Sequence, residues 1–316
     1  MSLRIGTRGS ALALWQSEEV KRLIGLIPGA PSVDLVIIKT RGDLQTDIPL
    51  WSTDGKGFFT AELDRALLDN EVDLLVHSLK DLATAMTAGT TLAAVLERED
   101  PHDALVARGG LDFASLPSGA RIGTSSLRRK AFLAKARPDL KQVELRGNVP
   151  TRLRKLDDGE YDAIILAAAG LKRLGLGARI TQILPTDIFP NAAAQGAIAI
   201  CARAGDAETL RWLRPLDHTQ TRVAVDAERA MLGRLEGGCQ VPLGALATVN
   251  GNELSLYAAA CNLDGRDFIS VTQSGHVSNA VALGDAAASA FISKGGDAVL
   301  AQANARRLAA TNPGQA

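Results

Sequence analysis

Short apolar segments that end in polar, mainly basic residues recur along this chain, and they limit the fold more than any other feature. In the clearest case, residues 74–76 (Leu-Leu-Val) suit a strand buried on both faces, as in a parallel sheet. The run His77-Ser78-Leu79-Lys80-Asp81 follows at once. Ligands of open α/β sheets bind at the carboxyl ends of the strands. A strand followed by a solvated loop explains one such segment well, but it explains a repeated pattern poorly.

Basic residues take this same place after several predicted strands. The strands are expected over residues 3–6, 33–39, 121–123, 142–145 and 161–168, and the residues that follow them are Arg8, Arg41, Arg128 with Arg129, Arg146 with Arg152, and Arg173. Arginine binds carboxylates and phosphates through two parallel hydrogen bonds. The shared position therefore predicts a ligand that carries several carboxylate or phosphate groups.

Two predicted helix starts have the features of an anion site. Ser10 precedes a helix expected over residues 11–27, and Arg8 lies just before it. Arg128 and Arg129 open a helix that extends to about residue 136. A helix N-terminus is already positive, so two arginines there are unfavourable unless an anion is present. Capping alone explains Ser10, but it does not explain the arginines.

Composition excludes several classes of protein. Lys plus Arg equals Asp plus Glu, 35 each, so net charge implies no nucleic-acid partner. The three cysteines, Cys201, Cys239 and Cys261, lack paired spacing, which argues against a disulfide framework or a zinc site and is typical of a reducing compartment. The sequence shows neither a signal peptide nor a membrane-spanning run. We expect a cytoplasmic protein with no membrane partner.

A chain of 316 residues is long enough for two or three domains. The charge run 97–103 suits a crossover into a second domain, with most of its charges in a solvated linker, and a strand at 195–200 suits the return. After residue 214 the pattern changes to a helix (219–235), a hairpin turning at Asn250-Gly251, a third strand and two Ala-rich helices. We predict an α/β domain from residues 1–97 and 196–214, a second α/β domain from 98–195, and a small α+β domain from 215–316.

Cys239 lies in a loop rather than in a periodic segment. It follows Gly237 and Gly238 and precedes Pro242. A buried structural cysteine is the commoner case, and the apolar segments of Cys201 and Cys261 fit it. Glycines instead let the backbone expose the sulfur, as covalent attachment requires. No histidine is marked by the sequence as a base for Cys239.

Together these segments resemble the porphobilinogen deaminase (hydroxymethylbilane synthase) family over nearly the whole chain. The matching motifs are Thr7-Arg8-Gly9-Ser10, Leu14-Trp15-Gln16, Thr40-Arg41-Gly42-Asp43, Gly55-Lys56-Gly57, His77-Ser78-Leu79-Lys80-Asp81, Glu97-Arg98-Glu99-Asp100-Pro101, Gly123-Thr124-Ser125-Ser126-Leu127-Arg128-Arg129, Leu145-Arg146-Gly147-Asn148, Ala169-Gly170-Leu171-Lys172-Arg173 and Leu235-Glu236-Gly237-Gly238-Cys239. So many motifs in a fixed order are highly specific.

The resemblance implies two domains similar to type II periplasmic binding proteins and a third, cofactor-bearing domain. It implies a monomeric transferase of haem biosynthesis that condenses four porphobilinogen molecules on a dipyrromethane cofactor, releases ammonia at each step, and hydrolyses off hydroxymethylbilane. The cofactor is attached through a thioether, here to Cys239. Each pyrrole carries an acetate and a propionate, which agrees with the independent inference of a ligand rich in carboxylates.

The resemblance also implies roles for individual residues. Asp81 is the catalytic carboxylate, which holds a pyrrole N–H and stabilises the azafulvenium cation left when ammonia departs. The residues implied to bind the cofactor are Cys239, Arg8, Ser10, Lys80, Asp81, Ser126, Arg128, Arg129, Arg146 and Gly147. Those implied to bind substrate are Arg8, Gln16, Arg146, Arg152, Arg173, Lys56 and Gln195. No metal is implied.

Two positions depart from the family pattern. Residues 191–196 are Asn-Ala-Ala-Ala-Gln-Gly, where the family usually has Pro-Ala-x-Gly-Gln-Gly, so Ala194 replaces a glycine and restricts the backbone. Ser52 stands where some relatives have a lysine. The alternative function is a non-catalytic anion-binding protein on the same scaffold. Cys239 and Asp81 distinguish the two, because a binder of carboxylates needs neither.

Overall fold

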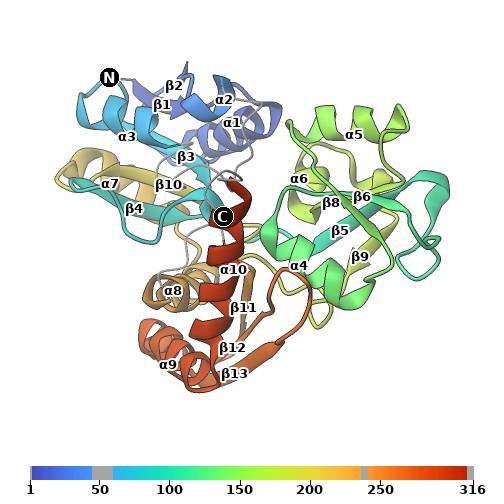
Figure 1. Cartoon of the computed structure of the whole chain (residues 1–316). Helices are drawn as coiled ribbons and strands as arrows, with labels where there is room; N and C mark the ends of the chain where they lie inside the picture. The colour runs from blue at the N-terminus through green and yellow to red at the C-terminus, as the bar shows by residue number, and fades with distance from the viewer. Residues whose placement is uncertain (1, 45–59, 236–240, 312–316) are drawn as a thin grey trace.

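The computed structural model describes residues 2–44, 60–235 and 241–311 and contains three sheets (Figure 1). Two five-stranded sheets are formed by the N-terminal two thirds of the chain, and a three-stranded sheet by the remainder. Helices cover all three sheets. We propose that the sheets are the cores of three domains with the boundaries predicted above.

The first sheet has the order β2-β1-β3-β10-β4. β1 (Leu3–Thr7) pairs in parallel with β2 (Val33–Ile37) and with β3 (Leu74–Ser78). β10 (Ile198–Arg203) is antiparallel to β3 and to β4 (Thr90–Val95). The sheet is therefore mixed, whereas the strand at 74–76 suggested a parallel one. Its helices are α1 (Ala11–Gly25), α2 (Arg41–Leu44), α3 (Ala61–Leu68) and α7 (Ala207–Leu213).

The second sheet repeats this topology in the order β7-β6-β8-β5-β9. β6 (Arg121–Gly123) is parallel to β7 (Lys141–Val143) and β8 (Ala163–Ala167), and β5 (Asp103–Ala107) is antiparallel to β8 and to β9 (Gln182–Leu184). Its helices are α4 (Leu127–Ala136), α5 (Val149–Asp157) and α6 (Ala168–Arg173). In each sheet the inner antiparallel strand is the one that follows a crossover from the other sheet.

Burial of β3 on both faces is confirmed, and it explains why this strand is so apolar. Leu74 and Val76 belong to a core cluster that includes α1, while Leu75 packs in a second cluster with Leu63 and Leu67 of α3. Helices therefore cover both faces of the strand, so no position before its end is suited to solvent. The first polar side chains appear where β3 leaves the core.

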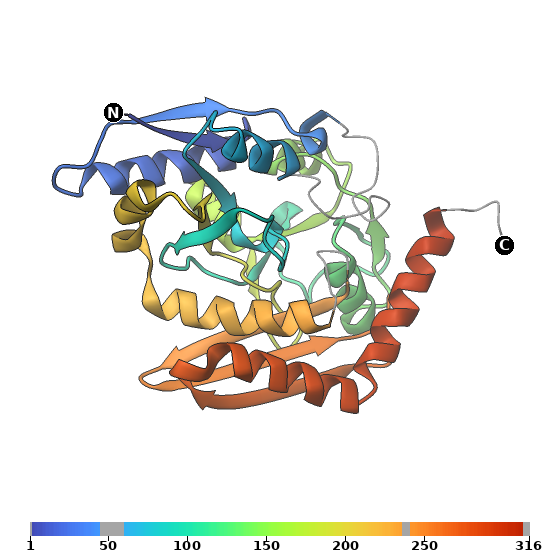
Figure 2. The ribbon, with the colours of Figure 1, turned by 90° about the vertical axis from the view of Figure 1, so that its left-hand side faces the viewer.

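The C-terminal part is α+β. The hairpin of β11 (Leu243–Asn250) and β12 (Glu253–Ala260) turns at residues 251–252, and β13 (Ile269–His276) extends the sheet. α8 (Thr219–Arg234) and α9 (Ala280–Ser293) share its core, and α10 (Gly296–Thr311) follows. In Figure 2, α8 lies between this sheet and the first one. Among the described residues, no helix is both long and apolar enough to span a membrane.

Glu228 of α8 contacts both segments that connect the first two sheets. Its carboxylate accepts hydrogen bonds from Arg98 Nη1 at 2.6 Å and from the backbone N–H of Ala194 at 2.5 Å. A third bond comes from the N–H of Ala247 in β11, at 2.8 Å. Glu228 is fully buried, so these donors replace its hydration shell. One carboxylate thus links the C-terminal part to both crossovers.

The expectation that charges 97–103 belong to a solvated linker was wrong for most of them. Arg98 is ion-paired with Glu228, and Asp103 is fully buried at the first position of β5. Only Glu97 is exposed in this run. The returning strand also begins later than expected, at Ile198, because Gln195–Ala197 belongs to a turn.

Candidate functional site

The end of β3 positions the residues that first drew attention in the sequence. Ser78 Oγ lies 3.0 Å from Gln16 Nε2 of α1, which holds the strand end to the helix. A short 3₁₀ helix, Leu79–Asp81, then places Lys80 half-buried and Asp81 exposed. Lys80 Nζ donates to Gln195 Oε1 at 3.1 Å. Asp81 forms no ion pair within the described part of the chain.

His77 does not serve as a second charge at this strand end. Its side chain is buried, and its Nε2 has no hydrogen-bond partner in residues 2–44, 60–235 and 241–311. Burial, assisted by the positive charge of Arg8, lowers the pKa of His77 to about 4. The imidazole is therefore neutral at neutral pH.

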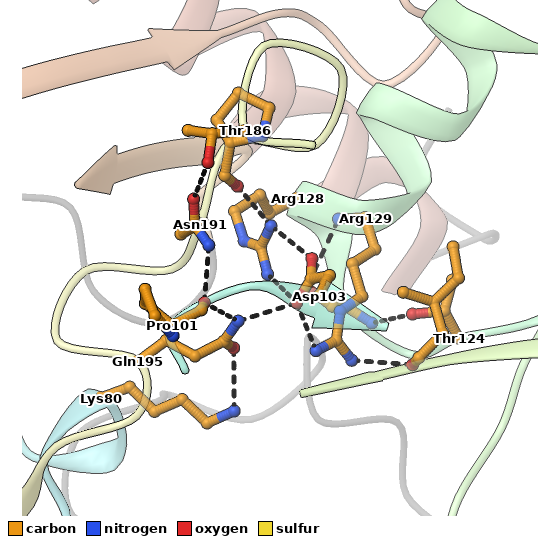
Figure 3. A network of polar contacts seen from close by, with 12 residues as sticks. Lys80, Pro101, Asp103, Thr124, Arg128, Arg129, Thr186, Asn191 and Gln195 are labelled. Carbon is orange, nitrogen blue, oxygen red and sulfur yellow. Dashed lines mark hydrogen bonds and ion pairs between the residues drawn. The ribbon is translucent and has the colours of Figure 1, made fainter. Parts of the chain in front are cut away.

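Asp103 is the centre of a buried polar network in the second sheet (Figure 3). Its carboxylate accepts from Arg128 Nη1 at 2.8 Å, Arg129 Nη2 at 2.8 Å and Gln195 Nε2 at 2.8 Å. Arg128 also donates to the Pro190 carbonyl. The two guanidinium groups hold the pKa of Asp103 well below its usual range despite its burial.

This network changes the interpretation of the arginines at the start of α4. They were predicted to need an anion, and the protein itself provides one in Asp103. Arg128 is 4% exposed and Arg129 is 6% exposed, so little of either side chain faces solvent. Ser126 caps the same helix by accepting from the N–H of Arg129 at 3.5 Å. Ser10 caps α1 in the same way, accepting from Ala13 N–H at 3.3 Å.

Arg152 and Arg173 differ from that pair, since neither forms an ion pair with a carboxylate among the described residues. Arg152 Nε donates to the carbonyl of Gly147 at 2.7 Å, and Arg173 Nη2 to that of Gly196 at 2.7 Å. Arg173 also lies over the Trp15 ring, 5.8 Å from its centroid. Burial lowers the pKa of each arginine to about 10, and both remain cationic at neutral pH.

Local geometry supports the turn that carries Arg146. Gly147 has a φ of +116°, and a Cβ there would lie 2.7 Å from Thr151 Cγ2, so only glycine fits. Asn148 caps α5 by accepting from Thr151 N–H at 3.0 Å. Burial lowers the pKa of the half-buried Arg146, an effect that Glu144 partly offsets.

Hydrogen bonds from Lys80 to Gln195 and from Gln195 to Asp103 connect the ends of the two sheets, and charges from both sheets interact there. Asp81 stabilises the charged forms of both Lys80, from the same strand end, and Arg152, from the second sheet. Desolvation lowers the pKa of Lys80 to about 8, with Asp81 and Asp103 opposing that shift and Arg128 and Arg129 adding to it. A carboxylate therefore lies beside cations supplied by both sheets.

Two predicted site residues lie outside the described residues, namely Lys56 and Cys239. The remaining cysteines match the expectation of structural thiols. Cys201 and Cys261 are buried and unpaired, and burial raises the pKa of each to about 12. No cluster of metal-ligating side chains occurs among the residues described.

Asp103 and Glu228 were missed as site residues by the sequence reasoning. Asp103 was assigned to a charge run, and Glu228 lay within the predicted helix 219–235 without being singled out. One signal was available for Asp103, because a charged residue directly before the apolar run Ala-Leu-Val-Ala cannot remain in solvent once the strand is buried. Nothing in the local sequence distinguishes Glu228 from Asp226.

The donor set suits a ligand with several carboxylates. Arg152 and Arg173 are partly buried, and no described residue supplies either of them with a carboxylate partner. A ligand carboxylate supplies the counter-charge. The dipyrromethane cofactor carries acetate and propionate groups, so these residues fit it. A neutral or cationic ligand would leave the same arginines uncompensated.

Comparison with known proteins agrees with this chemistry. Residues 3–211 match the family model "Porphobilinogen deaminase, dipyromethane cofactor binding domain", and residues 223–293 match "Porphobilinogen deaminase, C-terminal domain". The porphobilinogen deaminase of Roseiflexus castenholzii is 50% identical over 95% of this chain and 99% of its own length. That of Syntrophotalea carbinolica is 48% identical over 95% of each chain.

Solved structures that are similar to part of this chain include the methionine-binding protein MetQ. It has 14% sequence identity and a TM-score of 0.44, and it covers 68% of this chain and 89% of its own. The fold class is α/β, with two mixed five-stranded sheets of the same topology and an added α+β part. The two family models and the curated relatives cover nearly the whole chain, and the protein belongs to the porphobilinogen deaminase family.

Proposed function

We propose that this protein is a hydroxymethylbilane synthase. It condenses four porphobilinogen molecules head to tail, releases ammonia at each addition, and hydrolyses the product from the enzyme as hydroxymethylbilane. The observation that carries this proposal is that Asp81 interacts electrostatically with cations from both α/β sheets, Lys80 and Arg152, without an ion pair to either among the described residues. That arrangement suits a reaction in which positive charge develops on an anionic substrate.

The dipyrromethane cofactor, attached to Cys239 through a thioether, supplies the nucleophilic pyrrole carbon to which substrate is added. Its carboxylates are held by Arg8, Lys80 and Arg146 and by the cationic surroundings of Arg128 and Arg129. Backbone N–H donors come from the helix starts that Ser10 and Ser126 cap and from the turn at Gly147. Incoming porphobilinogen is bound by Arg152 and Arg173, with Arg8, Gln16, Arg146 and Lys56 completing its site.

Asp81 performs the electrostatic part of the reaction. An exposed carboxylate that no described residue pairs with can accept a hydrogen bond from the pyrrole N–H of the bound substrate. As ammonia leaves, positive charge spreads over that ring, and the nearby carboxylate stabilises it. Lys80 and Arg152 keep the group oriented without neutralising it by direct pairing.

A non-catalytic anion-binding protein is the alternative, and Cys239 and Asp81 argue against it. Neither is needed to hold carboxylates, and a carboxylate beside the arginines would weaken anion binding. We propose further that the enzyme is a cytoplasmic monomer without nucleic-acid or membrane partners. The balanced charge and the unpaired buried Cys201 and Cys261 support this assignment.

The mass of the intact purified protein tests the proposed function. We expect an adduct of two pyrrole units, which a peptide map places on Cys239, and we expect further units after brief exposure to porphobilinogen. Cys239→Ser should carry no adduct and make no product. Cys261→Ser is the matched control and should load normally. An adduct on Cys201 or Cys261, or conversion of porphobilinogen by Cys239→Ser, would overturn the assignment.

A further inference from the structure

We propose that Gln195 is a positioning residue. Its carboxamide holds the Lys80 ammonium at a fixed position relative to the Asp103 carboxylate, and so fixes the end of β3 against the second sheet. This inference rests on the proposed function and deepens it. Gln195 was expected to contact substrate. Its side chain is instead fully buried and has polar partners on both sides.

Hydrogen bonding leaves the Gln195 amide only one orientation (Figure 3). Its Oε1 accepts from Lys80 Nζ at 3.1 Å, while its Nε2 donates to Asp103 Oδ1 at 2.8 Å and to the Pro101 carbonyl at 2.8 Å. Lys80 can only donate, and the other two groups can only accept. A flipped amide would break all three hydrogen bonds, so the surrounding donor and acceptor groups determine its orientation.

The backbone around Gln195 is fixed as firmly as its side chain. The preceding Ala194 has a φ of +60°, and its N–H is bonded to Glu228. The following Gly196 has a φ of +89°, and a Cβ at that position would lie 2.3 Å from the Glu99 carbonyl oxygen. Because both neighbours are constrained, Gln195 offers Lys80 an acceptor at a defined place.

This contact joins Lys80 to the charges of the second sheet. The charged groups that act on Lys80 are Asp81, Arg129, Asp103 and Arg128. The amide transmits no net charge, but it holds the ammonium between Asp81 and Asp103. Loss of the amide frees the flexible lysine stem to move away from Asp81. Gln195 therefore acts on the reaction through Lys80.

The test observes the Lys80 side chain by NMR in protein labelled with ¹⁵N-lysine, with the signal assigned from Lys80→Arg. Gln195→Glu places a carboxylate beside the ammonium and should raise the pKa of Lys80 by about one unit or more. Gln195→Met removes the acceptor and should lower that pKa. The exposed Gln142→Met is the control and should leave it unchanged.

Kinetics of single porphobilinogen additions give a second readout. The ammonium is lost as pH rises through the pKa of Lys80, so the alkaline fall in rate should move upward in Gln195→Glu and downward in Gln195→Met. Near neutral pH we expect Gln195→Met to lower the rate about tenfold with KM changed less than about threefold. Equal Lys80 pKa values in the wild type and both variants would overturn the positioning role.

The inference and the proposed function fail in different ways. If the wild type adds no pyrrole to itself, the proposed function is wrong whatever the NMR result. If the wild type reacts but both variants keep its pH profile and its Lys80 pKa, only the role of Gln195 is wrong.

Discussion

Asp81 and Asp103 stand at the edges of the two α/β sheets, yet their surroundings are opposite. Asp103 is fully buried and is bonded to two guanidinium groups and an amide. Asp81 is exposed and, within the described chain, has no ion pair. A carboxylate whose charge is already compensated stabilises the protein. One whose charge is uncompensated remains available to a substrate.

The arginines divide in the same manner. Arg128 and Arg129 are compensated by Asp103, whereas Arg152 and Arg173 donate to backbone carbonyls and find no carboxylate among the described residues. Burial without a counter-charge is costly, and a ligand carboxylate removes that cost. Arginines that look equivalent in the sequence thus differ in what they do, and this difference can be tested.

The largest effect is expected for Asp81→Asn. The amide keeps the shape of the carboxylate but not its charge, so the variant should fold and bind porphobilinogen. Single additions to protein already carrying cofactor should slow about 10³-fold, or about 4 kcal/mol in activation free energy. Quenched-flow mass spectrometry measures the rate. A rate close to wild type would show that Asp81 is not the catalytic carboxylate.

The main expected effect of Asp103→Asn is a loss of stability. Removing one partner of a buried ion pair leaves the arginines uncompensated, and we expect a loss of about 3 kcal/mol in unfolding free energy, measured in urea. Asp162→Asn breaks the partly exposed pair with Arg121 and is the control, with an expected loss below about 1 kcal/mol.

The difference in unfolding free energy between the wild type and Asp103→Asn should depend on pH, because the pKa of Asp103 is lowered. A carboxyl with a depressed folded-state pKa stabilises fully above the unfolded value of about 4 and loses that contribution as pH falls below it. The stability gap between wild type and Asp103→Asn should therefore be constant from about pH 5 upward and narrow in acid. A gap that widens in acid would contradict the pairing.

Ala194→Gly should have the smallest effect. Glycine relieves a left-handed backbone that costs an L-residue about 1–2 kcal/mol. It also loses a buried methyl group worth about 0.8 kcal/mol and adds backbone entropy to the unfolded state. The unfolding free energy should change by less than about 1 kcal/mol. A larger change would mean that the Glu228 contact depends on the alanine itself.

Much of the fold could be predicted from the sequence because local patterns determine it. β3 is apolar because helices cover both its faces. The C-terminal hairpin was located correctly, but its two-residue turn is Gly251-Asn252, one position later than the predicted Asn250-Gly251. The replacement of glycine by Ala194 was correctly identified as a backbone constraint, since its φ is +60°.

The partners of the arginines could not be predicted, because those contacts join residues far apart in the chain. Asp103 lies 25 residues from Arg128 and 92 from Gln195. Periodicity and helix-start chemistry show that Arg128 needs an anion, but they do not show which one. Only the packing of β5 against α4 and the second crossover reveals that the anion belongs to the protein.

The central claim is that arginines with no carboxylate partner among the described residues bind the carboxylates of the substrate. It is tested most directly by a cycle that combines arginine variants with esterified substrates. Arg152→Met and the exposed Arg154→Met on the same helix are each given porphobilinogen or its acetate and propionate methyl esters. A charged hydrogen bond contributes about 1.5–3 kcal/mol, so one ester should slow single addition roughly 10-fold to 150-fold in wild type and in Arg154→Met. In Arg152→Met the same ester should cost less than about threefold. Equal ester penalties in all three proteins would contradict the account.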